Sequence, residues 1–220
     1  PADAEQHRGA LPFMPRVDAF RAEYGAAWRF TIDEKRGLPT LISGGSIPFI
    51  PGNANDLAWT DVAAGCRDNS CIPTDHVEGL ARTFIDENHE ILVVHPSDLV
   101  LDSAGTQPIG NHHYFLRFAN EVDSVPVDQA SLFFRINGGN LIQVASEKIA
   151  PVEVETTPSI DRTAGWAAVQ DYLGAAARAT DLIKDRGSLH LIPVTPKPVD
   201  PDAFEGPLGS GFGYKLAWKY

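Results

Sequence analysis

Histidine and glutamate residues between positions 89 and 95 come nearest in this sequence to a known catalytic pattern. Zinc proteases hold their metal with H-E-x-x-H on a helix, where a spacing of four residues places both imidazoles on one face. Here His89 and His95 are six residues apart, and the apolar residues between them are typical of a strand. In an extended segment the two rings would lie about 20 Å apart, at ~3.3 Å per residue. We therefore predict that this segment does not bind a metal ion.

A second histidine pair, His112 and His113, is adjacent in the sequence. Neighbouring residues on a strand point to opposite faces, so these rings cannot chelate one ion, and we expect one to be exposed and the other packed. A serine hydrolase would require G-x-S-x-G, and in the nearest string, residues 209–213, the serine is one place out of register. Because the sequence offers no catalytic constellation, we expect a chain that is not an enzyme and binds no cofactor or metal.

Charge and cysteine content restrict the partners and the compartment. The 18 basic and 29 acidic side chains give a net charge of −11, which would repel nucleic acid and anionic membranes. Cys66 and Cys71 enclose only four residues, a spacing that completes neither a tetrahedral zinc site nor a redox C-x-x-C motif. We predict a short disulfide in a surface loop, with two free cytosolic thiols as the alternative. A disulfide implies an exported protein, secreted or periplasmic after removal of a signal peptide.

The clearest strand pattern lies in residues 112–144 and predicts an antiparallel β-meander. Its first strand, residues 113–120, alternates, with Tyr114, Leu116 and Phe118 on one side and Phe115 and Arg117 on the other. The meander then continues through an Asp123-Ser124 turn, strands around Val125-Pro126-Val127 and over residues 132–136, a Gly138-Gly139-Asn140 hairpin turn, and a strand over residues 141–144.

Adjacent aromatic residues in the meander cannot all face the core. One of Phe133 and Phe134 must point outward unless both sheet faces are covered. We expect at least two of Phe115, Phe118, Phe133 and Phe134 in the core. The outward members are candidates for a surface on which a partner domain docks.

Residues 75–88 predict a helix that packs on the meander. Asp75 and Glu78 have the spacing of a capping box. Apolar side chains recur at helical spacing and form one face, namely Val77, Leu80, Ala81, Phe84 and Ile85. A helix laid into a curved antiparallel sheet is the simplest way to bury that face, and it predicts an α+β fold.

The remaining segments extend this arrangement at both ends. Residues 1–15 are expected to be an extended lead-in, residues 27–43 a hairpin, residues 44–74 a long clipped connection and residues 91–94 a short strand. A helix from Ser159 or Asp161 to about residue 179 follows the meander, with an apolar stripe of Trp166, Val169, Leu173 and Ala176 or Ala177. Strands over residues 188–194 and 214–220 complete the second half, and the last strand reads as cut off.

This order of elements resembles the fungalysin/thermolysin propeptide motif, in which an aromatic-rich strand, a short turn, a VPV-like step and a glycine hairpin follow one another. The first strand of that family commonly reads H-x-R-x-x-Q, and the matching positions here are Phe115, Arg117 and Asn120. Arg117 retains the arginine, and Ser124 stands where the family has a glycine, which reaches φ > 0 more easily. The second half resembles the start of a PepSY domain.

The resemblance implies antiparallel sheets each wrapped on a helix, as two cystatin-like or PepSY-like halves with an N-terminal β-hairpin extension. The domains would be residues 1–74, 75–150 and 151–220, the last possibly truncated at its C-terminal end. The motif and partner-surface candidates are Phe115, Arg117, Phe118, Asn120, Val125, Pro126, Val127, Phe133, Phe134, Gly138 and Gly139.

By the same resemblance, the chain would be the pro-domain of a secreted thermolysin-like or fungalysin-type zinc metalloprotease. Such pro-domains act as intramolecular chaperones and as inhibitors of their own catalytic domain until they are cleaved. The partner would be that catalytic domain, which would hold the zinc. Two other classes stay open: a stand-alone secreted binding module for a peptide or cell-wall ligand, and an enzyme of unfamiliar chemistry.

Overall fold

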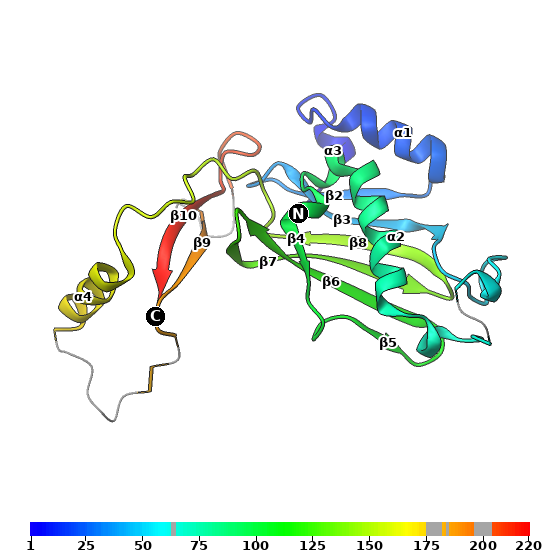
Figure 1. Cartoon of the computed structure of the whole chain (residues 1–220). Coiled ribbons are helices and arrows are strands. Elements are labelled where there is room, and N and C mark those ends of the chain that lie inside the picture. The colour runs from blue at the N-terminus through cyan, green and yellow to red at the C-terminus, as the bar shows by residue number, and fades with distance from the viewer. Residues whose placement is uncertain (63–64, 175–181, 184, 196–203) are drawn as a thin grey trace.

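The computed structural model describes residues 1–62, 65–174, 182–183, 185–195 and 204–220 and shows an α+β fold in which a mostly antiparallel sheet dominates (Figure 1). The helices are α1 (Met14–Tyr24), α2 (Thr74–Glu87), α3 (His89–Leu92) and α4 (Arg162–Leu173). The strands are β1 (Ala2–Asp3), β2 (Arg29–Asp33), β3 (Leu38–Pro48), β4 (Leu99–Leu101), β5 (Gln107–Ile109), β6 (His113–Val122), β7 (Val125–Asn137), β8 (Asn140–Glu147), β9 (Ser188–Val194) and β10 (Gly213–Lys219).

The predicted meander is confirmed and forms the centre of the sheet. The strand order is β1-β2-β3-β8-β7-β6-β4, and β5 pairs with the other end of β6. On β6, Tyr114, Leu116 and Phe118 are fully buried while Arg117 is exposed, as the alternation predicts. The two strands expected on either side of residue 129 form one strand, β7, which is irregular at Gln129, where φ is 58°.

Both turns of the meander use left-handed backbone. Asp123 and Ser124 have φ of 51° and 64°, a conformation that costs a serine more than a glycine. Gly138 and Gly139 have φ of 59° and 91°, and a Cβ on Gly139 would lie 2.4 Å from the carbonyl oxygen of Ile50. The hairpin turn therefore requires glycine both for its backbone and for close packing against the loop that follows β3.

Helix α2 lies across one face of the sheet, over the meander (Figure 1). Its predicted apolar face is buried at Val77, Ala81, Phe84 and Ile85 and partly buried at Leu80. The ring of Phe84 meets the ring of Phe134 edge to face, with centroids 5.8 Å apart. The helix therefore closes the hydrophobic core above the three central strands.

The predicted capping box at the start of α2 is wrong. Pro73 occupies the N-cap, where it provides no side-chain hydrogen bond. The carboxylate of Asp75 accepts from the adjacent N–H of His76, and Glu78 pairs with Arg82 at 2.8 Å. The helix begins one residue earlier than expected, so neither acid lies at the position from which it could cap.

The N-terminal segment shares the core of the meander. The predicted hairpin is confirmed as β2 and β3, and β3 pairs with β8, so the hairpin widens the same sheet. The predicted extended lead-in over residues 1–15 is wrong, because β1, a 3₁₀ turn (Ala4–His7) and the start of α1 lie there. Phe20 of α1 meets the rings of Trp28 and Phe30 edge-on at 5.6 and 5.4 Å. Only three side chains of α1 are buried, which explains its weak sequence signal.

Residues 91–94 do not form the predicted strand. The helical turn α3 follows α2 after Asn88, and it ends at Val93, whose φ is 55°. Ile91 and Leu92 point into the core and are buried. A run of four apolar residues fits a buried helical turn as well as a strand, so periodicity could not separate the two.

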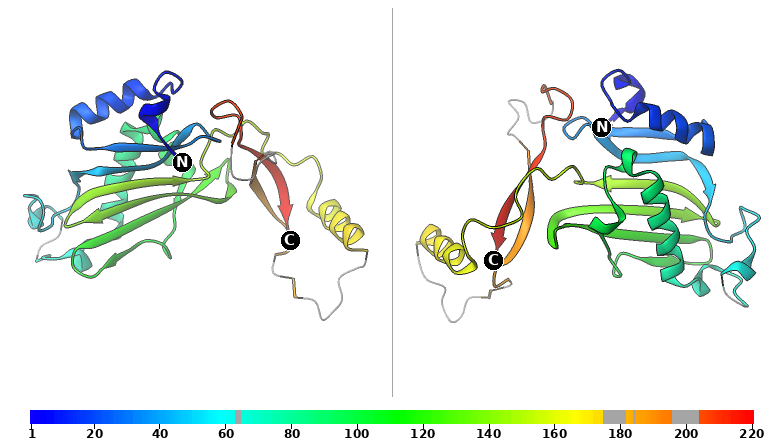
Figure 2. Two further views of the ribbon diagram at one scale, coloured as in Figure 1. Left: turned by 180° about the vertical axis from the view of Figure 1, so that it is seen from behind. Right: turned by 45° about the horizontal axis from the view of Figure 1, so that its top comes forward.

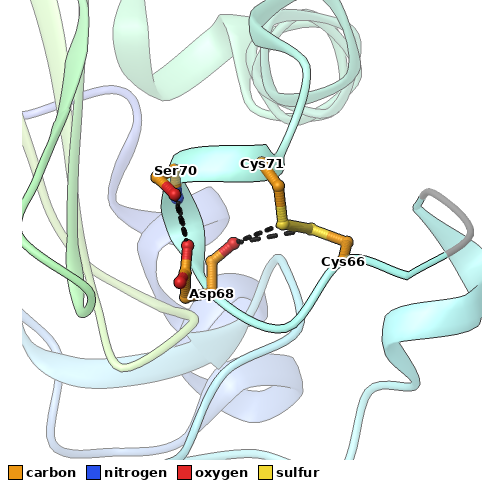
Figure 3. The surroundings of a disulfide bond; sticks show 4 residues. All are labelled: Cys66, Asp68, Ser70 and Cys71. Carbon is orange, nitrogen blue, oxygen red and sulfur yellow. Dashed lines mark hydrogen bonds between the residues drawn. A yellow bond between two sulfur atoms is a disulfide. The ribbon is translucent and has the colours of Figure 1, made fainter.

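The predicted disulfide between Cys66 and Cys71 is confirmed and closes a short loop (Figure 3). The carboxylate of Asp68 accepts hydrogen bonds from the N–H and hydroxyl of Ser70 at 2.9 and 2.5 Å. These hydrogen bonds hold the pKa of the Asp68 carboxyl below its usual value. The disulfide therefore reinforces a turn that already has its own local hydrogen bonds.

The C-terminal lobe, which we define as the described residues from 151 to 220, joins the sheet through β9, and its Leu191 and Tyr214 are buried in the same hydrophobic core as the meander. Strands β9 and β10 form an antiparallel hairpin, as expected, and one parallel pair connects Val127 of β7 to Leu191 of β9. Asp161 caps α4 by accepting from the N–H of Ala164, but the helix ends at Leu173 rather than near residue 179, because Gly174 is left-handed. The predicted stripe positions Ala176 and Ala177 lie outside the described residues.

Candidate interaction surfaces

Figure 2 (left) shows the sheet from the side opposite α2, and we call this face the open sheet face. The side chains that alternate outward along the strands line it. Phe118 and Phe134 point to the core and are fully buried, whereas Phe115 and Phe133 point to this face and are half-buried. The register of the strands places side chains of the open sheet face in rows that cross the sheet. One row contains Gln107, Phe115, Arg135, Gln143, Ser43 and Arg29. A second row contains Arg117, Phe133, Ala145, Leu41 and Thr31.

Arginines on the open sheet face lie beside the two phenylalanines. The guanidinium carbon of Arg135 is 5.7 Å from the centroid of the Phe115 ring, a cation–π contact. Arg117 is opposite Phe133 in register, and its Nε lies 3.7 Å from a carboxylate oxygen of Asp102. The face therefore combines flat apolar surface with cationic groups that remain accessible.

The other motif candidates contribute to the interior rather than to a surface. Phe118, Phe134, Val125 and Val127 are buried in the core, and Pro126 is half-buried next to them. Asn120 is buried and its amide donates to the carbonyl of Asp98 at 2.9 Å. Gly138 and Gly139 accept hydrogen bonds from Ala54 and Ile50 and anchor the loop after β3. Of the motif candidates, Phe115, Arg117 and Phe133 form the exposed or half-exposed group on one face.

His89 and His95 lie much closer together than the extended-segment estimate allows. Their rings stack with centroids 5.2 Å apart, because the segment between them is a helical turn that ends in left-handed Val93. They line a hollow of about 410 Å³ together with Glu90, Asp98, Asn120 and apolar side chains. Hydrogen bonds from Arg16 hold the pKa of Glu90 below its usual value. Among the described residues, no three His, Cys, Asp or Glu side chains are placed to hold a metal ion.

The second histidine pair is arranged as expected. His112 is exposed, and His113, at the start of β6, is half-buried. Only the ring of His113 contributes to the packed part of the sheet. The two rings therefore differ in burial, as predicted.

A serine, a histidine and an aspartate meet where the C-terminal lobe joins the sheet, which sequence reasoning missed. Ser188 Oγ is 2.9 Å from His190 Nε2, and His190 Nδ1 is 3.8 Å from the carboxylate of Asp128. Ser188 donates its proton to Asp185 at 2.5 Å, which lowers the pKa of that carboxyl. Because the hydroxyl proton is committed to Asp185 and the histidine–Asp128 distance exceeds a hydrogen bond, the arrangement lacks the geometry of a hydrolase triad. Only the i, i+2 spacing of Ser188 and His190 could have indicated it.

Large apolar side chains of the C-terminal lobe are exposed. Tyr172, Leu173 and Leu182 are 90%, 66% and 83% exposed. The start of α4 packs on the hairpin, where Trp166 meets the ring of Tyr220 at 5.3 Å. The far end of the helix projects from the rest of the molecule (Figures 1 and 2). The predicted apolar stripe is therefore covered at Trp166 and uncovered at Leu173.

Comparison with known proteins identifies no relative. No family model, no curated protein and no solved structure matches the chain. Of the helices in the described part of the chain, none combines the length and apolar character that crossing a bilayer requires.

Proposed function

We propose that this chain is the N-terminal pro-domain of an exported zinc metalloprotease, which templates the folding of the catalytic domain and inhibits it until processing. The observation that carries the proposal is the contrast between a closed central meander and a C-terminal lobe in which Tyr172, Leu173 and Leu182 are largely exposed. Exposed apolar clusters on soluble proteins commonly mark contacts with a protein partner.

The order and packing of the elements support the propeptide resemblance. Helix α2 lies on the meander, and the first turns of α4 contact Trp218 and Tyr220 at the end of the β9–β10 hairpin, so a helix followed by paired strands occurs twice along the chain. We interpret these as the two cystatin-like or PepSY-like halves. The arginine of the first strand, Arg117, is exposed, and the VPV step and the glycine hairpin build the interior of the first half.

The disulfide supports the part of the proposal that concerns export from the cytosol. Disulfides form and persist outside the reducing cytosol, so a Cys66–Cys71 bond fits a secreted or periplasmic precursor. A pro-domain needs no catalytic group of its own, and its partner would hold the zinc. The net charge of −11 favours a protein partner over nucleic acid or an anionic membrane.

Refolding of the catalytic domain tests the proposal. The coding sequence downstream of Tyr220 should encode H-E-x-x-H, and that downstream domain should be denatured and refolded with and without an equimolar amount of this chain. We expect the chain to raise the yield of folded domain at least tenfold, measured by near-UV circular dichroism and by activity after tag-based removal of the chain. Added to the folded protease, the chain should inhibit it.

A variant of α4 tests the role of the lobe in the same assay. Tyr172→Ser with Leu173→Gln removes the exposed apolar end of the helix and should weaken both effects, because the lost contacts are made only with the partner. Ala164→Gln with Ala167→Gln changes two exposed residues on the opposite side of α4 and should leave both effects intact. A chain that neither raises the refolding yield nor inhibits the protease would instead favour the stand-alone binding module, for which the hollow at His89 and His95 is the candidate site.

A further inference from the structure

Strand β9 joins the C-terminal lobe to the sheet by pairing in parallel with β7 at Val127 and Leu191. Next to this pair in the sequence are Asp128 on β7 and His190 on β9. A carboxylate oxygen of Asp128 lies 3.8 Å from Nδ1 of the His190 ring, and the two side chains are 22% and 16% exposed. Because both are mostly covered, salt and water screen their interaction less than that of a surface pair. The lobe is therefore attached beside a contact that a histidine proton can change.

The hydrogen bonds of Ser188 determine where the neutral His190 ring carries its proton. The Ser188 hydroxyl donates to the Asp185 carboxylate at 2.5 Å. A hydroxyl has only one proton, so its oxygen can only accept at the 2.9 Å contact with His190 Nε2. The proton of the neutral ring must therefore be on Nε2, and Nδ1 is left with a bare lone pair.

That lone pair faces another acceptor. His190 Nδ1 is buried and has no hydrogen-bond partner in the described part of the chain. The group before it is the carboxylate of Asp128, which can only accept, so a neutral ring makes no hydrogen bond there. Protonation of Nδ1 turns it into a charged donor. An approach of roughly 1 Å would then give the ~2.8 Å of a charge-assisted hydrogen bond.

The charges around His190 favour a protonated ring. The carboxylate of Asp128, on β7, approaches it directly, and that of Asp185, just before β9, approaches it through the intervening serine hydroxyl. On β10, the ammonium group of Lys219 binds Asp128 at 2.7 Å, and Lys215 lies on the same side of the strand. Both lysines are exposed, so solvent weakens their repulsion of a second cation. A carboxylate accepts several hydrogen bonds, so Asp128 can bind the lysine and the protonated ring together.

We propose that His190 is a pH-sensitive contact that fixes the C-terminal lobe on the sheet when its ring is protonated. A proton taken from solvent at Nδ1 forms the hydrogen bond to Asp128, and its loss breaks that bond and loosens β9 from β7. This stabilisation is present at mildly acidic pH and is lost as the pH rises through the range near ~6.5 in which histidines ordinarily ionise. The inference does not depend on the proposed function, because every group in it belongs to this chain.

Hydrogen exchange of the full chain, followed by NMR, tests the proposal. Protection factors, which are corrected for the intrinsic effect of pH on exchange, should be measured for the β9 amides at pH 5.5 and 7.5 and divided by those of β6 and β8. In the wild type we expect this ratio to be at least threefold higher at pH 5.5. Asp128→Asn retains the shape of the side chain and removes its charge, so the difference between the two pH values should disappear. His76→Gln, which removes a half-buried histidine from α2, is the matched control and should retain the difference.

Two outcomes would overturn the inference. One is a β9 protection ratio that does not change with pH in the wild type, or that changes equally in Asp128→Asn. The other comes from the ring nitrogens of His190 in the wild type, which need no variant. Their ¹⁵N chemical shifts at pH 8 should show a proton on Nε2 and none on Nδ1. A proton on Nδ1 would mean that the neutral ring already donates toward Asp128, and the contact would then not require a second proton.

Discussion

Helix α2 precedes the strands of the meander and α4 precedes β9 and β10, yet the two helices are packed very differently. Four side chains of α2 are buried, and the helix seals the core over the meander. In α4 only Gly165 is buried, and Tyr172 and Leu173 are largely exposed. Helix α2 lies on the sheet, which covers its apolar face, whereas α4 contacts the end of the β9–β10 hairpin through its first turns, at Gly165 and Trp166.

The difference shows that the two halves contribute differently to stability and to binding. Burial of large apolar side chains is the main source of folding free energy, so the sheet with α1 and α2 should determine the stability of the chain. The C-terminal lobe buries Leu191 and Tyr214 in the shared core but leaves Tyr172, Leu173 and Leu182 exposed, and these three are available for contact with a partner. Substitutions in the two halves should consequently have different readouts.

Removal of a core ring from the first half should give the largest effect. Phe134→Ala should lower the free energy of unfolding by about 3–5 kcal/mol, because the ring is fully buried against Phe84 and Phe118 and leaves a cavity. Phe133→Ala, its neighbour on the open sheet face, is the control and should cost about 1 kcal/mol or less. Urea unfolding followed by circular dichroism measures both. Similar losses for the two variants would contradict the burial difference on which the comparison depends.

Paired glycine substitutions in the two helices should sharpen the contrast. A Cβ on Gly165 would lie 2.5 Å from the hydroxyl of Tyr220 and 3.0 Å from Trp218, whereas a Cβ on Gly79 of α2 would meet nothing within 4 Å. Gly165→Ala should displace α4 at a cost of about 1–3 kcal/mol. Gly79→Ala should stabilise the chain by up to ~1 kcal/mol, because alanine favours helix.

Hydrogen exchange of the α4 amides measures the displacement. Exchange should accelerate in Gly165→Ala without a comparable change in the amides of β6, β7 and β8. Unchanged exchange protection of the α4 amides would mean that the helix tolerates the added methyl group. The close packing of Gly165 on the hairpin would then not hold α4 in place. Faster exchange in both halves would contradict the view that the lobe opens independently.

Alkaline pH should weaken the attachment of the C-terminal lobe to the sheet. The resulting loss of folding free energy should be smaller than the losses caused by the substitutions above. The hydroxyl of Tyr214 donates to the carbonyl of Lys148 at 2.6 Å, and burial raises the pKa of Tyr214 to about 12. A raised pKa means that the folded chain favours the neutral phenol, so this stabilisation is complete below the ordinary tyrosine pKa of ~10 and is lost as the pH rises toward about 12.

A comparison of wild type and Tyr214→Phe isolates this group. The difference in their free energies of unfolding should shrink between pH 10 and pH 12, because only the wild type can ionise at this position. Burial also raises the pKa of Tyr24 to about 12, but Tyr24 is present in both proteins and cancels. A difference that stays constant over this range would show that Tyr214 does not titrate within the folded chain.

Much of the first half could be predicted because its signals are local. Alternation along β6, the turn residues Asp123-Ser124 and Gly138-Gly139, and the apolar face of α2 each depend on residues close in sequence. The second half was predictable in its order of elements, whereas the end of α4 was not, since an alanine-rich run continues past Gly174 in the sequence.

Predictions from the sequence were wrong where a short segment takes its structure from contacts with residues that are distant in the chain. Helix α1 buries only three side chains, and its Phe20 is held by Trp28, Phe30 and Phe84 rather than by a regular apolar stripe. The turn α3 is helical because Ile91 and Leu92 fit the core from that position. Local propensity gave no means of distinguishing these outcomes.

The α+β class, the meander, the helix that covers it and the disulfide follow from local sequence, because period, turn chemistry and a short cysteine spacing are encoded within a few residues. Which surfaces remain open depends on how distant segments pack in the folded chain. Strand register aligned Arg29 and Arg135, which are more than a hundred residues apart, in one row, and a left-handed Val93 stacked His89 on His95. Register and chain reversal depend on contacts between distant segments, so both became visible only in the folded chain.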